Sequence, residues 1–174
     1  MQLMELKKGS RFVYAQQEWI LLDRQEDKHL CLSAATAGAR QYDRGMNARF
    51  DQAAISEWLN GAYYNSLLSA GAAAVDFNML MMNLSISTTA GDCIYVNRVG
   101  ILSLHQWRHY LTAISRQPLW QWQWTCSIID GINGPGLCCV AGKDGNYVYY
   151  PPNHPYPQVR PVLSLRGWAE VSKE

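Results

Sequence analysis

Cysteine has the widest chemical range of the residues in this chain, since a thiol can bind metal, form a disulfide or act as a nucleophile. The sequence holds five cysteines, and no two of them form a C-x-x-C pattern or a zinc-type spacing with histidine. Cys138 and Cys139 are adjacent, and neighbours in a strand point to opposite faces, so we expect no bond between them. We interpret all five as small buried hydrophobic residues with reduced thiols: Cys31, Cys93, Cys126, Cys138 and Cys139.

Two histidines have a spacing that can hold a metal ion. His105 and His109 stand four residues apart in a predicted helix, so they share one face of it. No third ligand follows from the spacing, and we interpret them as part of a solvated face. The sequence shows no cluster of carboxylates for calcium and no G-x-S-x-G, G-x-G-x-x-G or P-loop motif. We therefore assign no catalytic residue, metal site or cofactor.

The segment YVYYPPNHPYPQVRPVLSL, residues 147–165, combines tyrosines and prolines before it becomes apolar. Proline cannot continue a strand ladder and it fixes φ, so the segment predicts a rigid loop that leads into the last buried strand. Tyrosine gives a large contact area at low entropic cost, which favours a recognition surface. Its candidate ligand-binding residues are Tyr149, Tyr150, Asn153, His154 and Tyr156. The alternative is a self-packed loop that covers the edge of a sheet.

Three tryptophans alternate with polar residues in WQWQWTCSII, residues 120–129. This period of two predicts a strand with Trp120, Trp122 and Trp124 on one face. Such a stripe usually packs on a helix, but it can also stack sugars or aromatic groups. Trp120 is nearest to the start of the strand, and we add it to the candidate ligand-binding residues as the most exposed member.

The elements that position these residues follow from hydrophobic spacing. Apolar runs with short polar breaks predict a meander of strands over residues 5–33, and residues 34–50 lack periodicity and predict a loop. Apolar residues at three- and four-residue intervals predict a helix from Asp51, its cap, to Leu68, and Trp58 should pack it on the sheet.

A second helix is predicted after Ser103, which forms a capping-box pattern with Gln106. Closely spaced strands follow it. The order of strands, two helices and further strands predicts an α+β fold, with the helices packed on antiparallel sheets. We expect one domain over residues 1–174.

Charge and hydropathy narrow the function classes. The net charge of +1 gives no strong field for nucleic acid. Apolar stretches are short and interrupted, which predicts no membrane insertion. The opening MQLMELKKGSRF places its basic pair after the apolar residues, which is the wrong order for a signal peptide, so we expect a cytoplasmic protein as synthesised.

Four segments together resemble the motifs of one family. The first segment, ISEWLNGAYYNSLL, resembles S-x-x-R-x-W-L-N followed by an aromatic residue, and the second, VGILSLHQW, resembles a strand-then-helix segment. The third, WQWTCS, resembles the signature W-W-L-R-S, and the fourth, VRPVLSL, resembles a terminal V-R-P-A-L-x-L. In this order they resemble an uncharacterised domain family of bacteria and their phages. That family is related to the C-type lectin-like fold, in the branch with formylglycine-generating enzymes and the variable proteins of diversity-generating retroelements. Glu57 and Cys126 depart from its pattern, which favours arginine at both positions.

The resemblance implies a C-type lectin-like fold with long irregular loops. It implies a non-catalytic ligand-binding or display module for a protein or glycan, associated with a phage or bacterial surface by incorporation in a particle or by non-classical export. Two alternatives stay open: a cysteine-dependent oxidase of the formylglycine-generating kind, and a structural or assembly subunit of a phage particle. Arg160, within the V-R-P motif, is predicted to be structural and to bind carboxylates or loop carbonyls.

Overall fold

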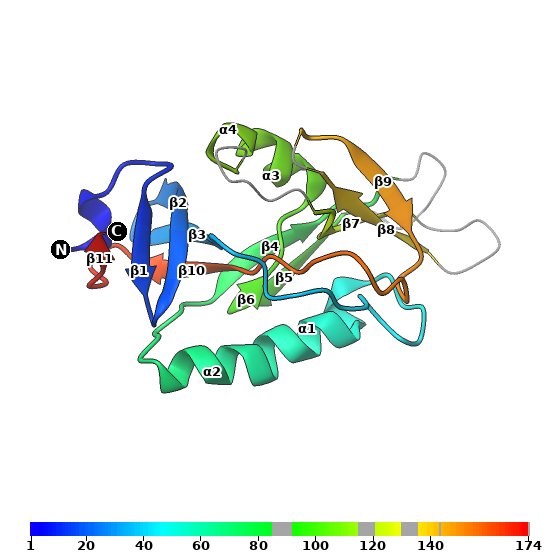
Figure 1. Ribbon diagram of the computed structural model, residues 1–174, viewed down its shortest axis with the longest axis horizontal. Helices are drawn as coiled ribbons and strands as arrows, with labels where there is room; N and C mark the ends of the chain where they lie inside the picture. Colours follow the sequence, from blue (N-terminus) through cyan, green and yellow to red (C-terminus); the bar gives the residue numbers. More distant parts are fainter. Residues whose placement is uncertain (85–91, 115–120, 130–135, 143, 174) are drawn as a thin grey trace.

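A six-stranded antiparallel sheet joins the two ends of the chain (Figure 1). The computed structural model describes residues 1–84, 92–114, 121–129, 136–142 and 144–173. The strand order of this sheet is β11-β1-β2-β3-β10-β6. The bounds are β1 Arg11–Tyr14, β2 Gln17–Gln25, β3 Lys28–Ser33, β6 Val99–Gly100, β10 Val162–Arg166 and β11 Ser172–Lys173. The meander predicted for residues 5–33 is confirmed, and β6, β10 and β11 complete its sheet.

Two smaller antiparallel sheets lie farther from the termini (Figure 1). The first pairs β4, Phe77–Met81, with β5, Cys93–Asn97. The second has the order β7-β8-β9, with bounds β7 Gln123–Ile129, β8 Leu137–Ala141 and β9 Tyr147–Tyr150. The N–H of Leu84 donates to the carbonyl of Ile128 at 2.8 Å, so the chain after β4 links the two sheets.

The first helical segment is continuous but changes its winding in the middle. α1, Ala54–Trp58, leads into a π-helical turn, Leu59–Tyr63, and then into α2, Tyr64–Ser69. Gly61 lies within the π turn, where its weak helix propensity costs least because the regular hydrogen-bond ladder is already interrupted. The buried side chains of the segment include Ile55, Leu59, Tyr63, Tyr64 and Leu67.

The start of this segment differs from the prediction, because Asp51 does not cap it. Asp51 lies in a short 3₁₀ turn, Phe50–Gln52, and the N-cap position belongs to Ala53, whose side chain cannot accept a hydrogen bond. The carboxylate of Asp43 accepts from the N–H of Ala54 at 2.9 Å instead. The cap therefore comes from the preceding loop, which a local sequence pattern does not reveal.

The prediction that Trp58 packs the first helix on the sheet is confirmed in part, because Trp58 packs against the hydrophobic core but is not fully buried. Its side chain is half-buried and lies against the ring of Tyr63, with ring centroids 5.3 Å apart. The guanidinium of Arg40 lies 4.1 Å from the centroid of the Trp58 ring on its open side. Ile55 and Leu59 are fully buried and supply the core face of the helix instead.

The second helical segment confirms the predicted capping box. In α3, Leu104–His109, the hydroxyl of Ser103 accepts from the N–H of Gln106 at 3.1 Å, and the Gln106 side chain accepts from the N–H of Ser103 at 3.0 Å. A further turn, α4, Leu111–Ile114, follows. His105 and His109 are both exposed, as expected for a solvated face.

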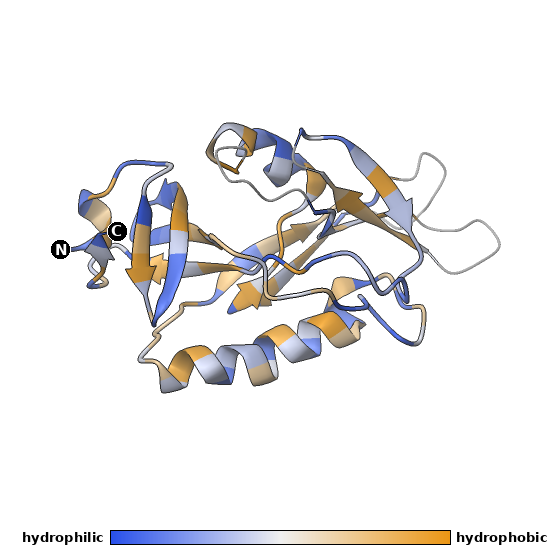
Figure 2. Ribbon diagram, in the orientation of Figure 1, coloured by the Kyte–Doolittle hydropathy of each residue, from blue (hydrophilic) through white to orange (hydrophobic). Residues whose placement is uncertain are grey.

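The molecule is therefore an α+β protein with mostly antiparallel sheets and few helices, as predicted. Figure 2 shows hydrophobic residues along the central strands, and alternating hydrophobic and hydrophilic residues along the segment from α1 to α2. This alternation fits a helix that covers the core with one face. Among the described residues, no helix is long and apolar enough to cross a membrane.

Candidate functional site

The loop after β9 brings three aromatic rings into a row: Tyr150, His154 and Tyr156. Tyr150 and His154 are stacked, with ring centroids 4.1 Å apart and an interplanar angle of 26°. The ring of Tyr156 meets His154 edge-on at 5.3 Å. Tyr156 is 76% exposed, while the other two are half-buried. We call these three residues the aromatic row.

Hydrogen bonds hold the loop of the aromatic row in place. The N–H of His154 donates to the carbonyl of Pro151 at 3.0 Å and closes a turn. Residues 40–43 of an earlier loop donate to three carbonyls: Asp43 N–H to Pro152 at 3.0 Å, Arg40 N–H to Pro157 at 3.2 Å, and Gln41 Nε2 to Asn153 at 2.8 Å. Because prolines also restrict the backbone, little conformational entropy remains to be lost when a ligand binds.

The same loop also covers the edge of a sheet. It leaves β9 at one edge of the three-stranded sheet and reaches β7 at the other. There the N–H of Gln158 donates to the carbonyl of Trp122 at 2.8 Å, and the carbonyl of Gln158 accepts from Trp124 at 3.0 Å. The two interpretations of the loop therefore apply to different parts of it: Gln158 covers the strand edge, and Tyr156 points to solvent.

Tyr149 lies apart from the aromatic row. It follows the strand alternation, so it projects from the face of β9 opposite to Tyr150. Its ring meets Tyr147 edge-on at 5.5 Å, and the guanidinium of Arg108 lies 4.9 Å from the Tyr147 ring. Burial, assisted by neighbouring Cys139, raises the pKa of Tyr149 to about 12. Tyr149 belongs to a contact between β9 and α3.

The remaining candidate residues differ in their positions. Asn153 is exposed at the turn of the loop, next to the aromatic row, and Gln41 holds its carbonyl. Trp120 lies outside the described residues. The tryptophan stripe is divided, because Trp122 is 38% exposed whereas Trp124 is 1% exposed.

Trp124 forms a buried aromatic pair with Tyr42. The two rings meet edge-on at 5.4 Å. The indole N–H of Trp124 donates to the carbonyl of Arg40 at 2.7 Å. The hydroxyl of Tyr42 has no hydrogen-bond partner among the described residues, and burial raises the pKa of Tyr42 well above its ordinary value. The strand prediction for this stretch is confirmed, and the packing role applies to Trp124.

The aromatic row contains one buried nitrogen without a partner among the described residues. The buried Nδ1 of His154 makes no hydrogen bond within the part of the chain that the structure describes. A catalytic histidine needs a partner that orients it, usually a carboxylate, and no described carboxylate accepts a hydrogen bond from the His154 ring. Stacked rings match the flat apolar surface of a ligand.

Burial keeps the thiols of Cys138 and Cys139 protonated. None of the five cysteines forms a disulfide bond, and Cys93 is the one that is only partly buried. Burial raises the pKa of Cys139 to about 11, and it raises the pKa of Cys138 well above its ordinary value. A buried thiol with a raised pKa stays protonated at neutral pH, which removes its nucleophilic form. Across the described ranges, no group of three His, Cys, Asp or Glu side chains is placed to hold a metal ion.

Arg160 has the structural role that the sequence predicts. Its side chain is 2% exposed and donates to the carbonyls of Ser33 at 2.8 Å and Ala34 at 3.2 Å. Burial lowers the pKa of Arg160 to about 10, with a contribution from Arg11. It joins the end of β3 to the start of β10.

Residues 40–43 support the site, and no sequence pattern predicted this role. Arg40, Gln41 and Asp43 bond the carbonyls of the aromatic-row loop from more than a hundred positions away along the chain. They lie in a stretch without periodicity, so spacing does not single them out. The local sequence that follows, YDRGMN, has polar residues around a glycine, and this pattern predicts only a turn.

Comparison of this chain with protein-family models, with curated proteins and with solved structures found no match. A functional assignment therefore depends on the geometry described above.

Proposed function

We propose that this protein is a non-catalytic binding module with a C-type lectin-like arrangement, and that the aromatic row recognises a protein or glycan. The observation that carries the proposal is the stacked row of Tyr150, His154 and Tyr156 on a proline-restricted loop. A row that is ordered before binding presents its surface at low entropic cost.

The arrangement of elements supports the fold part of the proposal at a coarse level. Two helical segments lie beside antiparallel sheets, and long loops connect them (Figure 1). The proposed phage or bacterial surface context depends on the sequence resemblance alone. The oxidase alternative has less support, because Cys138 and Cys139 are buried and their pKa values are raised.

The chemistry of the row suits the apolar face of a sugar ring or a prolyl or aromatic side chain. Ring faces attract such groups by stacking, and the exposed Asn153 beside them can hydrogen-bond to a hydroxyl or amide. This combination of flat contact and few polar groups is typical of adaptable recognition surfaces.

An array of immobilised glycans and bacterial surface proteins tests the proposal. The wild-type protein and the double variant Tyr150→Ala with Tyr156→Ala would be compared on every array member that the wild type binds. We expect the double variant to lose at least about fivefold in affinity for each hot-spot ring. Tyr147→Ala is the matched control, since Tyr147 is exposed on the opposite face of β9, and its affinity should equal that of the wild type.

Two outcomes would contradict the proposal. One is binding that the double variant retains in full. The other is a stable homo-oligomer in sedimentation analysis with no binding to any array member, which would favour the assembly-subunit alternative.

A further inference from the structure

A polar hollow of about 640 Å³ lies against one face of the first helical segment. Lining residues on that segment recur at intervals of three and four positions, as one face of a helix requires. The lining residues that matter below are Ser56, Glu57 and Tyr64 from the helical segment, Asp51 from the turn before it, and Asp76 and Arg98 from the opposite side. No residue of the aromatic row lines the hollow.

One hydroxyl that lines the hollow has no partner in the protein. Ser56 is 8% exposed, and its hydroxyl makes no hydrogen bond to any residue that the structure describes. The oxygen is not fully enclosed, so it is open to a molecule in the hollow. A hydroxyl both donates and accepts, so it can bond either the N–H or the carbonyl of a ligand's amide.

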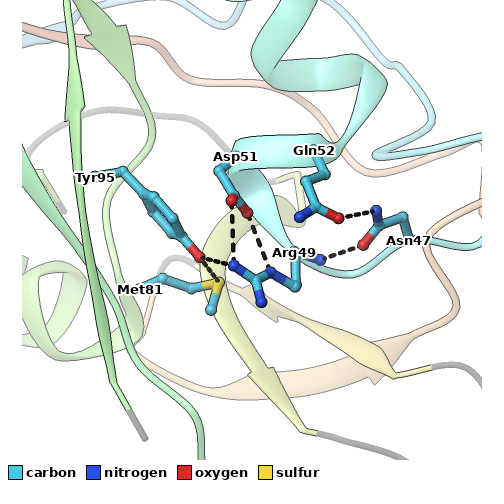
Figure 3. A network of polar contacts seen from close by, with 6 residues as sticks. All are labelled: Asn47, Arg49, Asp51, Gln52, Met81 and Tyr95. Carbon is cyan, nitrogen blue, oxygen red and sulfur yellow. Dashed lines mark hydrogen bonds and ion pairs between the residues drawn. The ribbon is translucent and has the colours of Figure 1, made fainter. Parts of the chain in front are cut away.

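Figure 3 shows a polar network at the end of the hollow nearest to the start of α1. The guanidinium of Arg49 bonds both oxygens of Asp51, at 3.3 and 3.2 Å, and donates to the hydroxyl of Tyr95 at 3.2 Å. Glu57 lies one turn into the helix, is exposed, and makes no ion pair in the described part of the chain. Two carboxylates are thus present beside one guanidinium, so this end keeps one unpaired negative charge.

The other end of the hollow has the opposite charge. The Nε of Arg98 donates to the carboxylate of Asp76 at 3.1 Å, and the guanidinium lies 5.5 Å from the centroid of the Tyr64 ring. The Nζ of Lys28 donates to the backbone carbonyl of Asp76 at 3.1 Å and adds a second cation. Two cations are thus present beside one carboxylate. A guanidinium has five N–H donors, so Arg98 keeps donors for a further acceptor.

The distance between the two ends indicates the length of a ligand. Glu57 and Tyr64 are seven positions apart, which corresponds to about 10 Å at a helical rise of about 1.5 Å per residue. An extended chain spans at most about 3.3–3.6 Å per residue, so a peptide of two or three residues covers roughly 7–10 Å. A single amino acid carries both charges on one carbon and is shorter than this distance.

The two charges of the hollow exclude other small ions. A polyamine would place a cation beside Lys28 and Arg98, and a dicarboxylate would place an anion beside Glu57. Like charges at such positions repel. A ligand with one charge of each sign, one at each end, avoids both conflicts.

We propose that this hollow binds a short peptide of two or three residues with both ends free. The ammonium group of the peptide pairs with Glu57, its carboxylate accepts from Arg98, and the hydroxyl of Ser56 bonds a peptide group between them. Hydrogen bonds to charged groups are stronger than those between neutral groups. The site shares no residue with the aromatic row, so its test does not depend on the proposed function.

Titrations of ¹⁵N-labelled protein with trialanine and its end-blocked forms test the proposal. We expect trialanine to shift amide signals of residues 51–64 and 97–98. Acetyl-trialanine lacks the ammonium group and trialanine amide lacks the carboxylate, so each should bind at least about fivefold more weakly. Alanine alone should also bind more weakly than trialanine, because it is shorter than the distance between the two ends.

Substitutions at the two ends should respond to different blocked peptides. Glu57→Gln should weaken trialanine binding and remove the further effect of acetylation, while the effect of amidation remains. Arg98→Gln should give the reverse pattern. The matched controls are Glu26→Gln and Arg24→Gln, exposed changes near the turn between β2 and β3, and both should leave all affinities unchanged.

Ser56→Ala separates binding from folding. Its hydroxyl bonds no described residue, so urea denaturation should show an unchanged midpoint. Trialanine should nevertheless bind about two- to tenfold more weakly, as expected for the loss of one hydrogen bond. A change in the midpoint with unchanged affinity would contradict the role given to this hydroxyl.

Four outcomes would overturn the proposal as a whole. The first is equal affinity for trialanine and its blocked forms, and the second is the absence of shifts at residues 51–64 and 97–98. The third is equal affinity for alanine and trialanine, which would exclude a peptide. The fourth is a set of shifts confined to residues 150–156, which would mean that the aromatic row binds the peptide instead.

Discussion

The buried aromatic pair, Tyr42 and Trp124, and the aromatic row lie on two sides of one loop. Residues 40–43 bond the indole of Trp124 through the carbonyl of Arg40, and they bond the loop of the row through the N–H of Asp43. The pair is almost fully buried, whereas Tyr156 is largely exposed. Residues 40–43 therefore contact both the buried pair, which we call the packed layer, and the exposed aromatic row, which we call the open layer. We infer that stability is concentrated in the pair and that the row can vary at little cost.

The largest expected effect is on the buried side. Trp124→Ala should lower the free energy of unfolding by about 3–5 kcal/mol, because it removes a buried ring and leaves a cavity beside Tyr42. Trp122→Ala is the matched control, and it should cost about 1 kcal/mol or less because that ring is partly exposed. Urea denaturation measures both. Equal costs for the two variants would end the distinction between a packed and an open layer.

The next effect concerns the loop that connects the layers. Asp43→Ala removes the acceptor for the N–H groups of Ala54 and Asn47, so it should cost about 1–2 kcal/mol. Asp43→Asn keeps one acceptor oxygen and should cost less. The same urea experiment, together with NMR signals of the His154 ring, would show whether the aromatic row loosens when the cap is lost. An unchanged midpoint for Asp43→Ala would mean that the loop needs no such anchor.

Smaller effects are expected within the aromatic row. Tyr156→Ala should change the free energy of unfolding by about 0.5 kcal/mol or less, as is usual for exposed positions. The double variant with Tyr150→Ala should cost roughly 1 kcal/mol, because it also loses the stacking on His154. A fall of several kcal/mol with an unchanged denaturant slope would instead make the row a clamp for the last strand.

The smallest expected effect is on the pH dependence of stability, through the titration of Tyr149, which lies apart from the aromatic row. The pKa of Tyr149 is raised to about 12 in the folded protein, chiefly by burial, against roughly 10 in an unfolded chain. Folding therefore favours the neutral phenol: this contribution is complete below about pH 10 and is lost as pH rises toward about 12. Tyr149→Phe should lose less stability over that interval than the wild type does. Ultraviolet absorbance of the phenolate checks the titration, and identical pH profiles for the two proteins would contradict it.

Spacing predicted those features that depend on neighbours in the chain. The capping box at Ser103 is local, and it is present. The alternation in WQWQWTCSII predicts a strand, and β7 is that strand. The same rule places Tyr149 and Tyr150 on opposite faces of β9, so the separation of Tyr149 from the aromatic row follows from the pattern of the strand.

Contacts between distant segments could not be predicted in this way. The helix cap comes from Asp43, eleven residues before Ala54, and the local candidate Asp51 bonds Arg49 instead. Trp58 matches the helical spacing, but it is half-buried, and Arg40 from a distant loop lies over its ring. The hydrogen bond from Arg49 to the hydroxyl of Tyr95 joins the turn before α1 to β5, and no spacing within either element encodes it.

The pairing of the first and last strands makes this chain suitable for circular permutation. The N–H of Val171 donates to the carbonyl of Met1 at 2.9 Å, so the two ends lie side by side, and β11 pairs with β1. A short flexible linker could join Lys173 to Met1, and new ends could be opened at the hairpin between β8 and β9, where Gly145 turns with φ of +76°. The resulting circular permutant would keep every sheet contact. It would also carry a fused reporter at the start of β9, beside Tyr147 and on the face opposite to Tyr150.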